Sequence, residues 1–494
     1  MKPIPTCHII QRQYLHVEVG GTESEGLALQ RPLSDLCLRG LLPAIERVLD
    51  RHTPLNGDHL YVERLEIDVG ILPLDRLEHD LAESVAQAVE KSLREQMEQI
   101  LPRKSSATRT SENLGNVQHK TQQQSINEVF IYFLKTGNLP WWFRLPAGVN
   151  LEQVMLDSWQ KSEKLGADAI NEAALRTLAS PIAKKRLIHQ FSPVFLETLL
   201  SLLSPEGKKI MNGVLKALHS PDTPPVDMPL VDTKNFERQL WGMVFSNLAR
   251  GSSIAPTYLV GETWKILPAT ERPAELAKLL ERQWPDVIGK VSNIQTDIKV
   301  PNIQTEIEPT QRDSPASQAL LGTSEHPDAA EGIYIENAGI VLLHPFLPRL
   351  FEVLGIAAGD KLLQPDRALC LLHFLVTGQS AAPEYELMLP KILCGIPLET
   401  PVESSIELTD AEKEEATALL EAVIRHWEAL RNTSLDGLRG TFLIRAGKVS
   451  MREDGDWLLQ VEAQTYDILL DQLPWSISMI KLPWMQRMLW VEWT

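Results

Sequence analysis

Two residues in the C-terminal third of the chain, Cys370 and His373, have the spacing of two metal ligands on one helix face. Side chains three apart on a helix are neighbours, but a zinc site needs three or four ligands. Neither Cys394 nor His344 stands at a spacing that would complete such a set. We therefore expect a buried cysteine and a core histidine here, with no metal and no other cofactor.

The sequence also lacks the spacings of known catalytic sites. It contains no GxSxG, no HExxH, no Walker A loop and no GxGxxG after an expected strand. Glu66 and Asp68 share one face of an expected strand, which is typical of a solvated strand face rather than of paired catalytic carboxylates. The sequence thus predicts no catalytic residues and a protein that is not an enzyme.

Tryptophan gives the most informative pattern. Five of the 12 tryptophans fall in the last 38 residues, and an adjacent pair follows Leu139-Pro140. Tryptophan is enriched at the energetic centres of protein interfaces because it buries much surface. Two interpretations are open, packing in a core and contact with a partner protein. The candidates for partner contact are Trp141, Trp142, Trp475, Trp484, Trp490 and Trp493.

Composition and charge place the chain among globular proteins with several cores. Its 494 residues are 44% hydrophobic and 23% charged, and this length predicts two to four domains. The formal net charge of −17 argues against nucleic-acid binding, which needs a basic surface. No uninterrupted apolar stretch is long enough for a membrane span, and no signal peptide or CxxC pair occurs. We expect a cytoplasmic protein without membrane insertion.

Residues 1–101 are expected to form a small α+β domain. Residues 15–19 and 65–71 alternate apolar and polar side chains, which is the period of a half-buried strand. Apolar residues at helical spacing predict helices over 34–50 and 75–100. The predicted order is strand, helix, strand, helix.

Two polar stretches divide the rest of the chain. Residues 102–124 carry few large aliphatic side chains, so they bury too little surface to offset the entropy of ordering, and we expect a linker. Residues 289–330 are expected to form a second linker. Between them, residues 125–288 show helical spacing throughout and predict a helical domain of short helix pairs.

Residues 331–494 predict a second α+β domain with a hairpin and tryptophan-rich strands. The turn Glu453-Asp-Gly-Asp456 marks the hairpin, because Asp-Gly accepts positive φ. Its first strand is 441–445 or 448–452, and its second is 457–464. The remaining expected elements are helices near 343–354, 365–377 and 409–431 and alternating segments at 475–481 and 488–493. The fold class is α+β and predominantly helical.

One five-residue pattern, Phe-Leu-x-Thr-Gly, occurs twice. Phe133-Leu-Lys-Thr-Gly137 and Phe374-Leu-Val-Thr-Gly378 each end an expected helix, where glycine fits the left-handed position that follows the last turn. The repetition raises the hypothesis of a duplicated helical motif.

Four segments resemble sequences of the contractile injection system tape measure family. In chain order they are Phe133–Trp142 (FLKTGNLPWW), Arg186–Ser192 (RLIHQFS), Ile335–Leu347 (IENAGIVLLHPFL), and Trp475–Trp484 (WSISMIKLPW) with Val491–Trp493. The N-terminal strand–helix–strand block is similar as well. The similar segments occur in every expected domain and in neither expected linker.

The resemblance implies a structural assembly protein of a bacterial injection particle that governs inner-tube length. It implies contact with the inner-tube protein and with baseplate hub and spike proteins, and it implies no catalytic residues. A phage tape measure is expected to be long and almost wholly helical, whereas this chain is of moderate length and mostly folded. Three interpretations therefore stay open: a ruler, an assembly scaffold, and an adaptor or chaperone-like module for cargo or baseplate proteins of the same machine.

Overall fold

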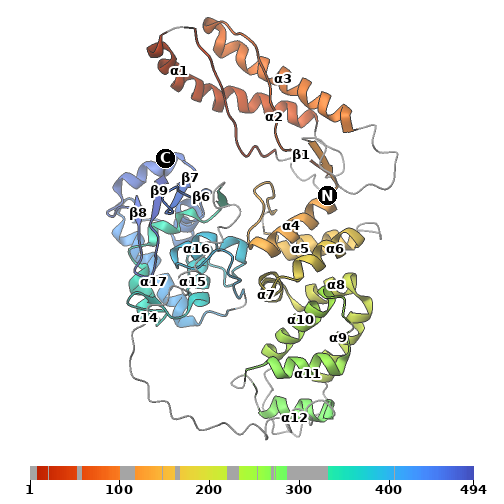
Figure 1. The fold of residues 1–494 in the computed structure, drawn as a ribbon. Coiled ribbons are helices and arrows are strands. Elements are labelled where there is room, and N and C mark those ends of the chain that lie inside the picture. Colours follow the sequence, from red (N-terminus) through yellow and green to blue (C-terminus); the bar gives the residue numbers. More distant parts are fainter. Residues whose placement is uncertain are drawn as a thin grey trace, which may run out of the picture. The chain divides into compact units, whose positions relative to one another are not determined.

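The computed structural model divides the chain into two compact units (Figure 1). One unit is Met1–Glu128 with Asp157–Gly166, and the other is Val129–Leu156 with Ala167–Thr494. Within the second unit we call residues 129–156 and 167–285 the helical part, and residues 332–493 the C-terminal part. The structure describes residues 8–20, 22–52, 58–100, 117–146, 148–161, 167–219, 233–252, 254–268, 272, 274–285, 332–404 and 406–493.

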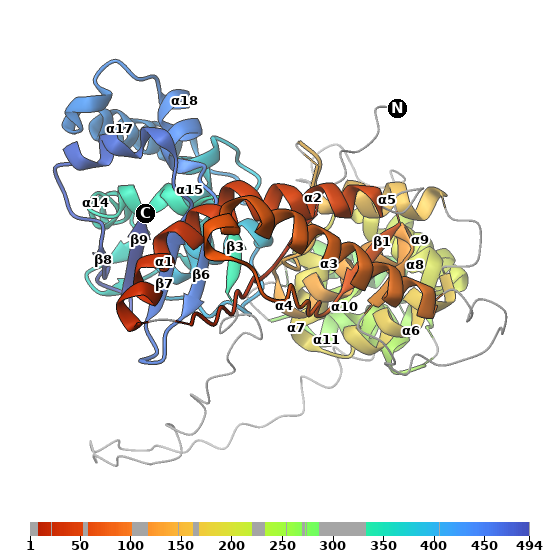
Figure 2. The ribbon, with the colours of Figure 1, turned by 90° about the horizontal axis from the view of Figure 1, so that it is seen from above.

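The first unit is built on two helical rods that lie side by side (Figure 2). One rod runs through α1 (Glu23–Leu36), the π-helical η1 (Cys37–Leu41) and α2 (Leu42–Arg51), and the other is α3 (Leu77–Ile100). Apolar residues at helical spacing meet between the rods, as expected for amphipathic helices. The buried set is Leu41, Ala44, Val48, Leu81, Val85, Ala86, Val89 and Leu93.

The helix predicted over 34–50 forms, but its rod begins at Glu23. Pro32 lies inside α1, although a proline there removes one backbone hydrogen bond and usually ends a helix. Because of this proline, the sequence before residue 34 does not predict the helix that the structure contains there.

The strands predicted over 15–19 and 65–71 are wrong. A strand needs a neighbour to pair its backbone, and neither run has one in the part of the chain that the structure describes. The alternation of the second run still governs packing up to residue 69, because Leu65, Ile67 and Val69 pack against the helical rods while the polar residues between them are exposed. The last apolar residue of the run, Ile71, is fully exposed. The strand that does form is β1 (His59–Val62), antiparallel to β2 (Val117–Lys120).

Both predicted linkers fall largely outside the described residues. All of 289–330 lies outside them, and so do residues 102–116. Residues 117–124 are described and form β2 and the start of α4 (Gln122–Thr136), so regular structure resumes before the expected boundary. The reason is that β2 pairs through its backbone and needs few aliphatic side chains. The division into three separately folding domains stays a prediction.

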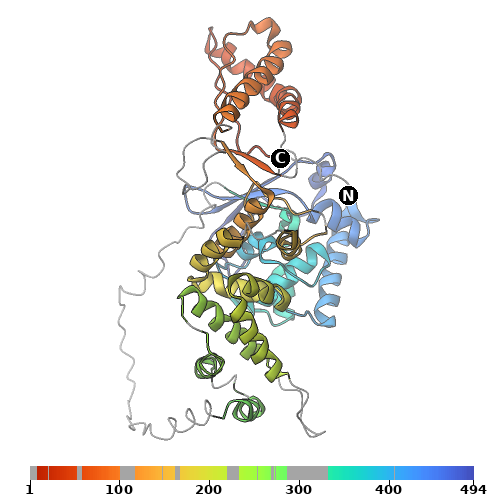
Figure 3. The ribbon, with the colours of Figure 1, turned by 90° about the vertical axis from the view of Figure 1, so that its right-hand side faces the viewer.

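The middle of the chain is helical, as predicted. Proline stands at the first position of α7, α8, α9 and α11, where its missing N–H costs no helical hydrogen bond. Figures 1 and 3 show this part from two sides; within it, α10 packs on α6, α7 and α11, and α8 packs on α9. After α4 the helices are α5 (Leu151–Lys161), α6 (Ala167–Leu178), α7 (Pro181–Gln190), α8 (Pro193–Leu203), α9 (Pro205–Leu218), α10 (Lys234–Ala249), α11 (Pro256–Ile266) and α12 (Ala274–Gln283).

The C-terminal part wraps helices and one sheet around a single apolar core, which confirms the predicted α+β class. Its longest helix, α17, begins at a capping box: the Thr409 hydroxyl accepts the Glu412 N–H, and the Glu412 carboxylate accepts the Thr409 N–H at 2.7 Å. Its main helices are α14 (Leu347–Val353), α15 (Pro365–Thr377), α16 (Met388–Leu393) and α17 (Asp410–His426).

The sheet of this part has five strands in the order β3-β6-β7-β9-β8. The predicted hairpin is confirmed with the later of its two alternative first strands, because β6 pairs antiparallel with β7. The parallel pairing of β7 with β9 brings the C-terminal tryptophans into the sheet. The strands are β3 (Ile333–Ile335), β6 (Gly447–Met451), β7 (Trp457–Val461), β8 (Met479–Ile480) and β9 (Leu489–Trp493); a separate small hairpin joins β4 (Ala357–Ala358) and β5 (Lys361–Leu362).

Gly339 sits where two backbone segments of the C-terminal part touch. A Cβ at this position would overlap with the carbonyl oxygen of Phe442, which is backbone and cannot rotate away. The glycine of the Asn-Ala-Gly-Ile segment is therefore required by close packing in the core.

We expect Gly339→Ala to destabilise the second unit by at least ~3 kcal/mol, the upper end for overpacking, because no side chain can yield. Thermal unfolding measures the loss. Gly440→Ala is the matched control, since a Cβ there meets nothing within 4 Å. Similar melting temperatures for both variants would contradict the packing argument.

Candidate functional site

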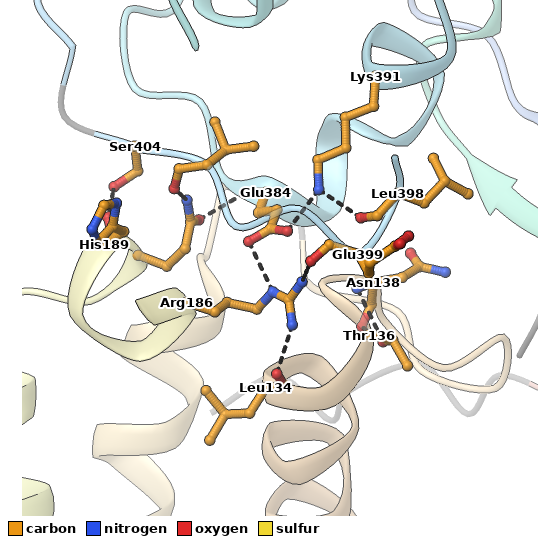
Figure 4. A network of polar contacts seen from close by, with 12 residues as sticks. Leu134, Thr136, Asn138, Arg186, His189, Glu384, Lys391, Leu398, Glu399 and Ser404 are labelled. Atoms are coloured by element: carbon orange, nitrogen blue, oxygen red, sulfur yellow. Dashed lines mark hydrogen bonds and ion pairs between the residues drawn. The ribbon is translucent and has the colours of Figure 1, made fainter. Parts of the chain in front are cut away.

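Arg186 is fully buried where the helical part meets the C-terminal part (Figure 4). Its Nε donates to Glu384 Oε2 at 2.9 Å. Its Nη1 donates to Leu134 O at 2.6 Å, and its Nη2 donates to Glu399 O at 2.7 Å. The planar guanidinium presents donors in several directions, so one arginine ties α7 to the end of α4 and to the C-terminal part. We call all contacts between these two parts the junction.

The carboxylate of Glu384 is shared between two buried cations. Lys391 Nζ donates to Glu384 Oε1 at 2.6 Å and to Leu398 O at 2.8 Å. The side chains of Arg186, Glu384 and Lys391 are all 0% exposed. Burial lowers the pKa of Lys391, and the negative charge of Glu384 opposes that shift. Buried charges are tolerated only with their partners in place, so removing one member leaves the others uncompensated.

Neutral hydrogen bonds surround this ion network. Gln190 uses both ends of its amide: Nε2 donates to Val402 O at 2.8 Å, and Oε1 accepts the Glu384 N–H at 2.8 Å. The carbonyl of His189 accepts the Ser404 hydroxyl at 2.7 Å. The end of α7 is therefore fixed to two separate segments of the C-terminal part.

The junction is polar, whereas the C-terminal part has an apolar core of its own. Every buried member of that core, and every partly buried apolar side chain packed against it, comes from residues 333–493. Further ion pairs cross the junction, between Arg238 and Glu403 at 3.0 Å and between Arg144 and Glu336. Such a surface is typical of contact between two folded bodies rather than of one continuous core.

One aromatic contact accompanies these polar groups. The ring of Tyr385 meets the ring of Phe133 edge-on, with centroids 6.0 Å apart. Tyr385 directly follows Glu384, so one short turn, η7 (Glu384–Glu386), brings both an acid and an aromatic ring to the end of α4.

Cys370 and His373 have separate hydrogen-bond partners. His373 Nε2 lies 2.7 Å from Glu386 Oε2, and Cys370 Sγ lies 3.9 Å from the Glu403 carbonyl. Burial raises the pKa of the Cys370 thiol to about 12, which keeps it protonated and unreactive. Within the described ranges, no three His, Cys, Asp or Glu side chains are grouped to hold a metal ion.

The four C-terminal candidate tryptophans are partly buried, and each indole N–H has an acceptor within the C-terminal part. Trp484 also stacks on Phe351, with ring centroids 5.2 Å apart. The donors and acceptors are Trp475 to Leu342 O at 3.0 Å, Trp484 to Leu393 O at 2.8 Å, Trp490 to Asp456 Oδ2 at 3.2 Å and Trp493 to Asp467 Oδ2 at 3.1 Å. These contacts give the tryptophans a place in the fold, and their role toward a partner stays a prediction.

Trp141 and Trp142 lie apart from that group, in a turn shortly after α4. Both are partly buried, and the Trp142 ring meets the Phe143 ring edge-on at 6.2 Å. Their role in partner binding is likewise still a prediction.

The four segments that carry the family resemblance meet in pairs. Leu134 of the first segment is bound through its carbonyl by Arg186, the first residue of the second segment. Leu342 of the third segment is bound through its carbonyl by Trp475, the first residue of the fourth. Segments that are separate in the sequence are thus joined by hydrogen bonds from side chains within them.

Residues 7–493 match the model of the contractile injection system tape measure protein family. The chain belongs to this family. No curated protein and no solved structure matches it. The match extends the likeness of the four short segments to nearly the whole chain.

As a tape measure protein, the chain is a part of the injection particle and has a structural role in tube length. It is not an enzyme. None of the described helices is both long and apolar enough to cross a membrane.

The buried ion network of Arg186, Glu384 and Lys391 was not predicted from the sequence, although two signals pointed to it. Helical spacing places Arg186 on the same face as Ala183 and Leu187, where a charge is unexpected. Lys391 lies in the short helix α16, all of whose other residues are apolar. A charge on an apolar face predicts a buried partner, but it does not reveal which acid supplies it.

Replacing Glu384 by Gln is expected to destabilise the second unit by about 3–5 kcal/mol, because breaking a buried ion pair leaves uncompensated charge. The amide keeps the shape of the carboxylate, but it removes the charge and turns an NH2 donor toward Arg186 or Lys391, each of which now donates to its own carboxylate oxygen. Chemical denaturation at pH 7 measures the loss. Glu428→Gln is the control, since its ion pair with Arg431 is exposed and contributes little. Equal stability of the two variants would rule out the compensation argument.

Proposed function

We propose that this tape measure protein acts as a folded assembly scaffold for the inner tube, rather than as a stretched ruler. In this proposal it binds the inner-tube protein and the baseplate hub and spike proteins while the particle assembles in the cytoplasm. The junction is the observation that supports it. The helical part and the C-terminal part flank residues 289–330 in the sequence, and the Arg186 network holds those two parts together.

A ruler needs a segment whose two ends are drawn apart. The 42 residues of 289–330 would span at most roughly 140–150 Å when fully extended. While the junction is closed, however, the ends of this segment belong to parts that remain in contact. Added residues then enlarge a loop, and each doubling of loop length costs only about 0.6 kcal/mol. Loop length and tube length are therefore uncoupled in a scaffold.

Inserting 20 or 40 Gly/Ser-rich residues within 289–330 is expected to leave tube length unchanged. Electron microscopy of purified particles measures the length distribution. Deleting the whole chain is the control, and it should abolish particles or scatter their lengths. Tubes that grow by a fixed increment per inserted residue would establish the ruler instead. Co-purification with cargo, without tube or baseplate proteins, would favour the adaptor.

Changing Trp141 and Trp142 together to Ala should impair particle assembly more than folding. The pair follows shortly after the end of α4, which takes part in the junction, and large aromatic residues contribute strongly to protein interfaces. Particle yield and circular dichroism of the purified variant provide the two measurements. An unfolded double variant would show that the pair serves only the core.

A further inference from the structure

The end of helix α15 repeats the backbone geometry and several hydrogen bonds of the end of helix α4. Both helices end in Phe-Leu-x-Thr-Gly, and both glycines are left-handed, with φ of +80° at Gly137 and +73° at Gly378. The Gly137 N–H donates to Phe133 O at 2.7 Å, and the Gly378 N–H donates to Phe374 O at 2.8 Å. The short sequence repeat is therefore also a repeat of backbone geometry.

The threonine of each motif repeats its hydrogen bonds as well. Thr136 Oγ1 donates to the carbonyl four residues earlier at 2.9 Å, and Thr377 Oγ1 does the same at 2.9 Å. Each hydroxyl then accepts the N–H two residues later, from Asn138 at 3.2 Å and from Gln379 at 3.1 Å.

A distant arginine binds the same carbonyl in both copies. Arg186 donates to the leucine carbonyl of the first motif, and Arg439 Nε donates to the leucine carbonyl of the second, Leu375 O, at 3.1 Å. In each copy the guanidinium lies close to the glycine, because a Cβ on Gly137 or Gly378 would meet it at 3.0 or 3.2 Å. The two helix ends are therefore built from the same groups. We call the end of α4 the occupied twin and the end of α15 the open twin.

The twins differ in what covers them. Thr136 and Asn138 are 6% and 4% exposed, because the C-terminal part lies over the end of α4. The corresponding end of α15 is open, since Gly378, Gln379 and Ser380 are all exposed.

The end of α4 is covered by the turn η7, which presents an acid and an aromatic ring. Its acid, Glu384, binds Arg186, and the adjoining aromatic residue, Tyr385, packs on Phe133. At the open twin, the acid nearest to Arg439 is Asp436, with Oδ1 at 3.6 Å from Nη1 and a side chain 95% exposed. Arg439 thus has a solvent-exposed aspartate where Arg186 has a buried glutamate.

Of the residues at this end, Gly378, Gln379 and Ser380 are exposed, whereas the Arg439 side chain is 14% exposed and lies over the Phe374 ring. We propose that this exposed end of α15, residues 378–380 beside Arg439, is a docking site for a second protein of the particle. The occupied twin indicates the chemistry of the occupant: a loop that presents a carboxylate next to an aromatic side chain. The carboxylate binds Arg439, and the aromatic ring packs beside Phe374. This inference deepens the proposed scaffold function, because it names the surface through which the chain binds a tube or baseplate protein.

A photo-crosslinking amino acid placed at Ser380 in the full-length chain tests this site in particle-producing cells. After irradiation, an affinity tag recovers the chain, and mass spectrometry identifies the crosslinked peptide. The expected product joins Ser380 to a tube or baseplate protein, on a peptide with Asp or Glu beside Phe, Tyr or Trp. The same crosslinker at the exposed Glu428 is the positional control and should not yield this peptide.

Two substitutions examine the role of charge. Gln379→Glu adds a like charge beside the expected carboxylate and should lower the crosslink yield about tenfold, whereas Gln379→Lys should retain or increase it. Gln379 is exposed, so both variants are expected to fold normally. Arg439→Gln should also lower the yield at least tenfold, with thermal unfolding reported beside it because Arg439 also caps α15.

The proposal is overturned if particles with normal tubes form and Ser380 gives no intermolecular adduct. It is equally overturned if the adduct lies on a second copy of this chain, on a peptide without an acid, or if both Gln379 variants crosslink alike. These outcomes leave the scaffold function intact, because tube length after insertion into 289–330 tests that function separately.

Discussion

The sharing of one carboxylate, Glu384, between Arg186 and Lys391 is the interaction on which the second unit depends. All three side chains are withdrawn from water, so each charge is stable only while the other two are in place. This requirement fixes the turn that carries Glu384, the end of α4 and the last turn of α7 at one point. Gly137 is part of the same constraint, because a Cβ there would lie 2.5 Å from the Glu384 carboxylate.

The forces that stabilise the C-terminal part internally differ from those that join it to the helical part. The C-terminal part buries its apolar residues in a closed core, whose stability grows with the apolar area removed from water. The junction contributes through directional hydrogen bonds, which fail when an angle or a partner is wrong. A polar junction therefore specifies one arrangement of two folded bodies, which is what a scaffold for an assembly with a fixed length requires.

The sequence predicted the parts of this structure that follow from local periodicity. The helical middle, the α+β C-terminal part and its Asp-Gly hairpin are all confirmed, because each depends on side chains close together in the chain. The N-terminal strands were wrong because alternation shows which face is apolar but not whether a neighbour pairs with the backbone. The ion network was missed for a related reason: Arg186 and Glu384 lie 198 residues apart, and no local pattern connects them.

The two Phe-Leu-x-Thr-Gly helix ends separate what a motif fixes from what its surroundings decide. Threonine, glycine and the leucine carbonyl produce the same backbone geometry in both copies, and an arginine from elsewhere in the chain completes it each time. Whether that helix end is covered depends on a turn carrying an acid and an aromatic ring, which the chain supplies to α4. At α15 the exposed Asp436 is the acid nearest to the arginine. The end of α15 has the geometry of the covered end of α4, yet its surface is exposed. Binding of another protein in the assembled particle explains this combination better than chance repetition does. In such a particle, the contact that holds the chain together would also hold it to its neighbour.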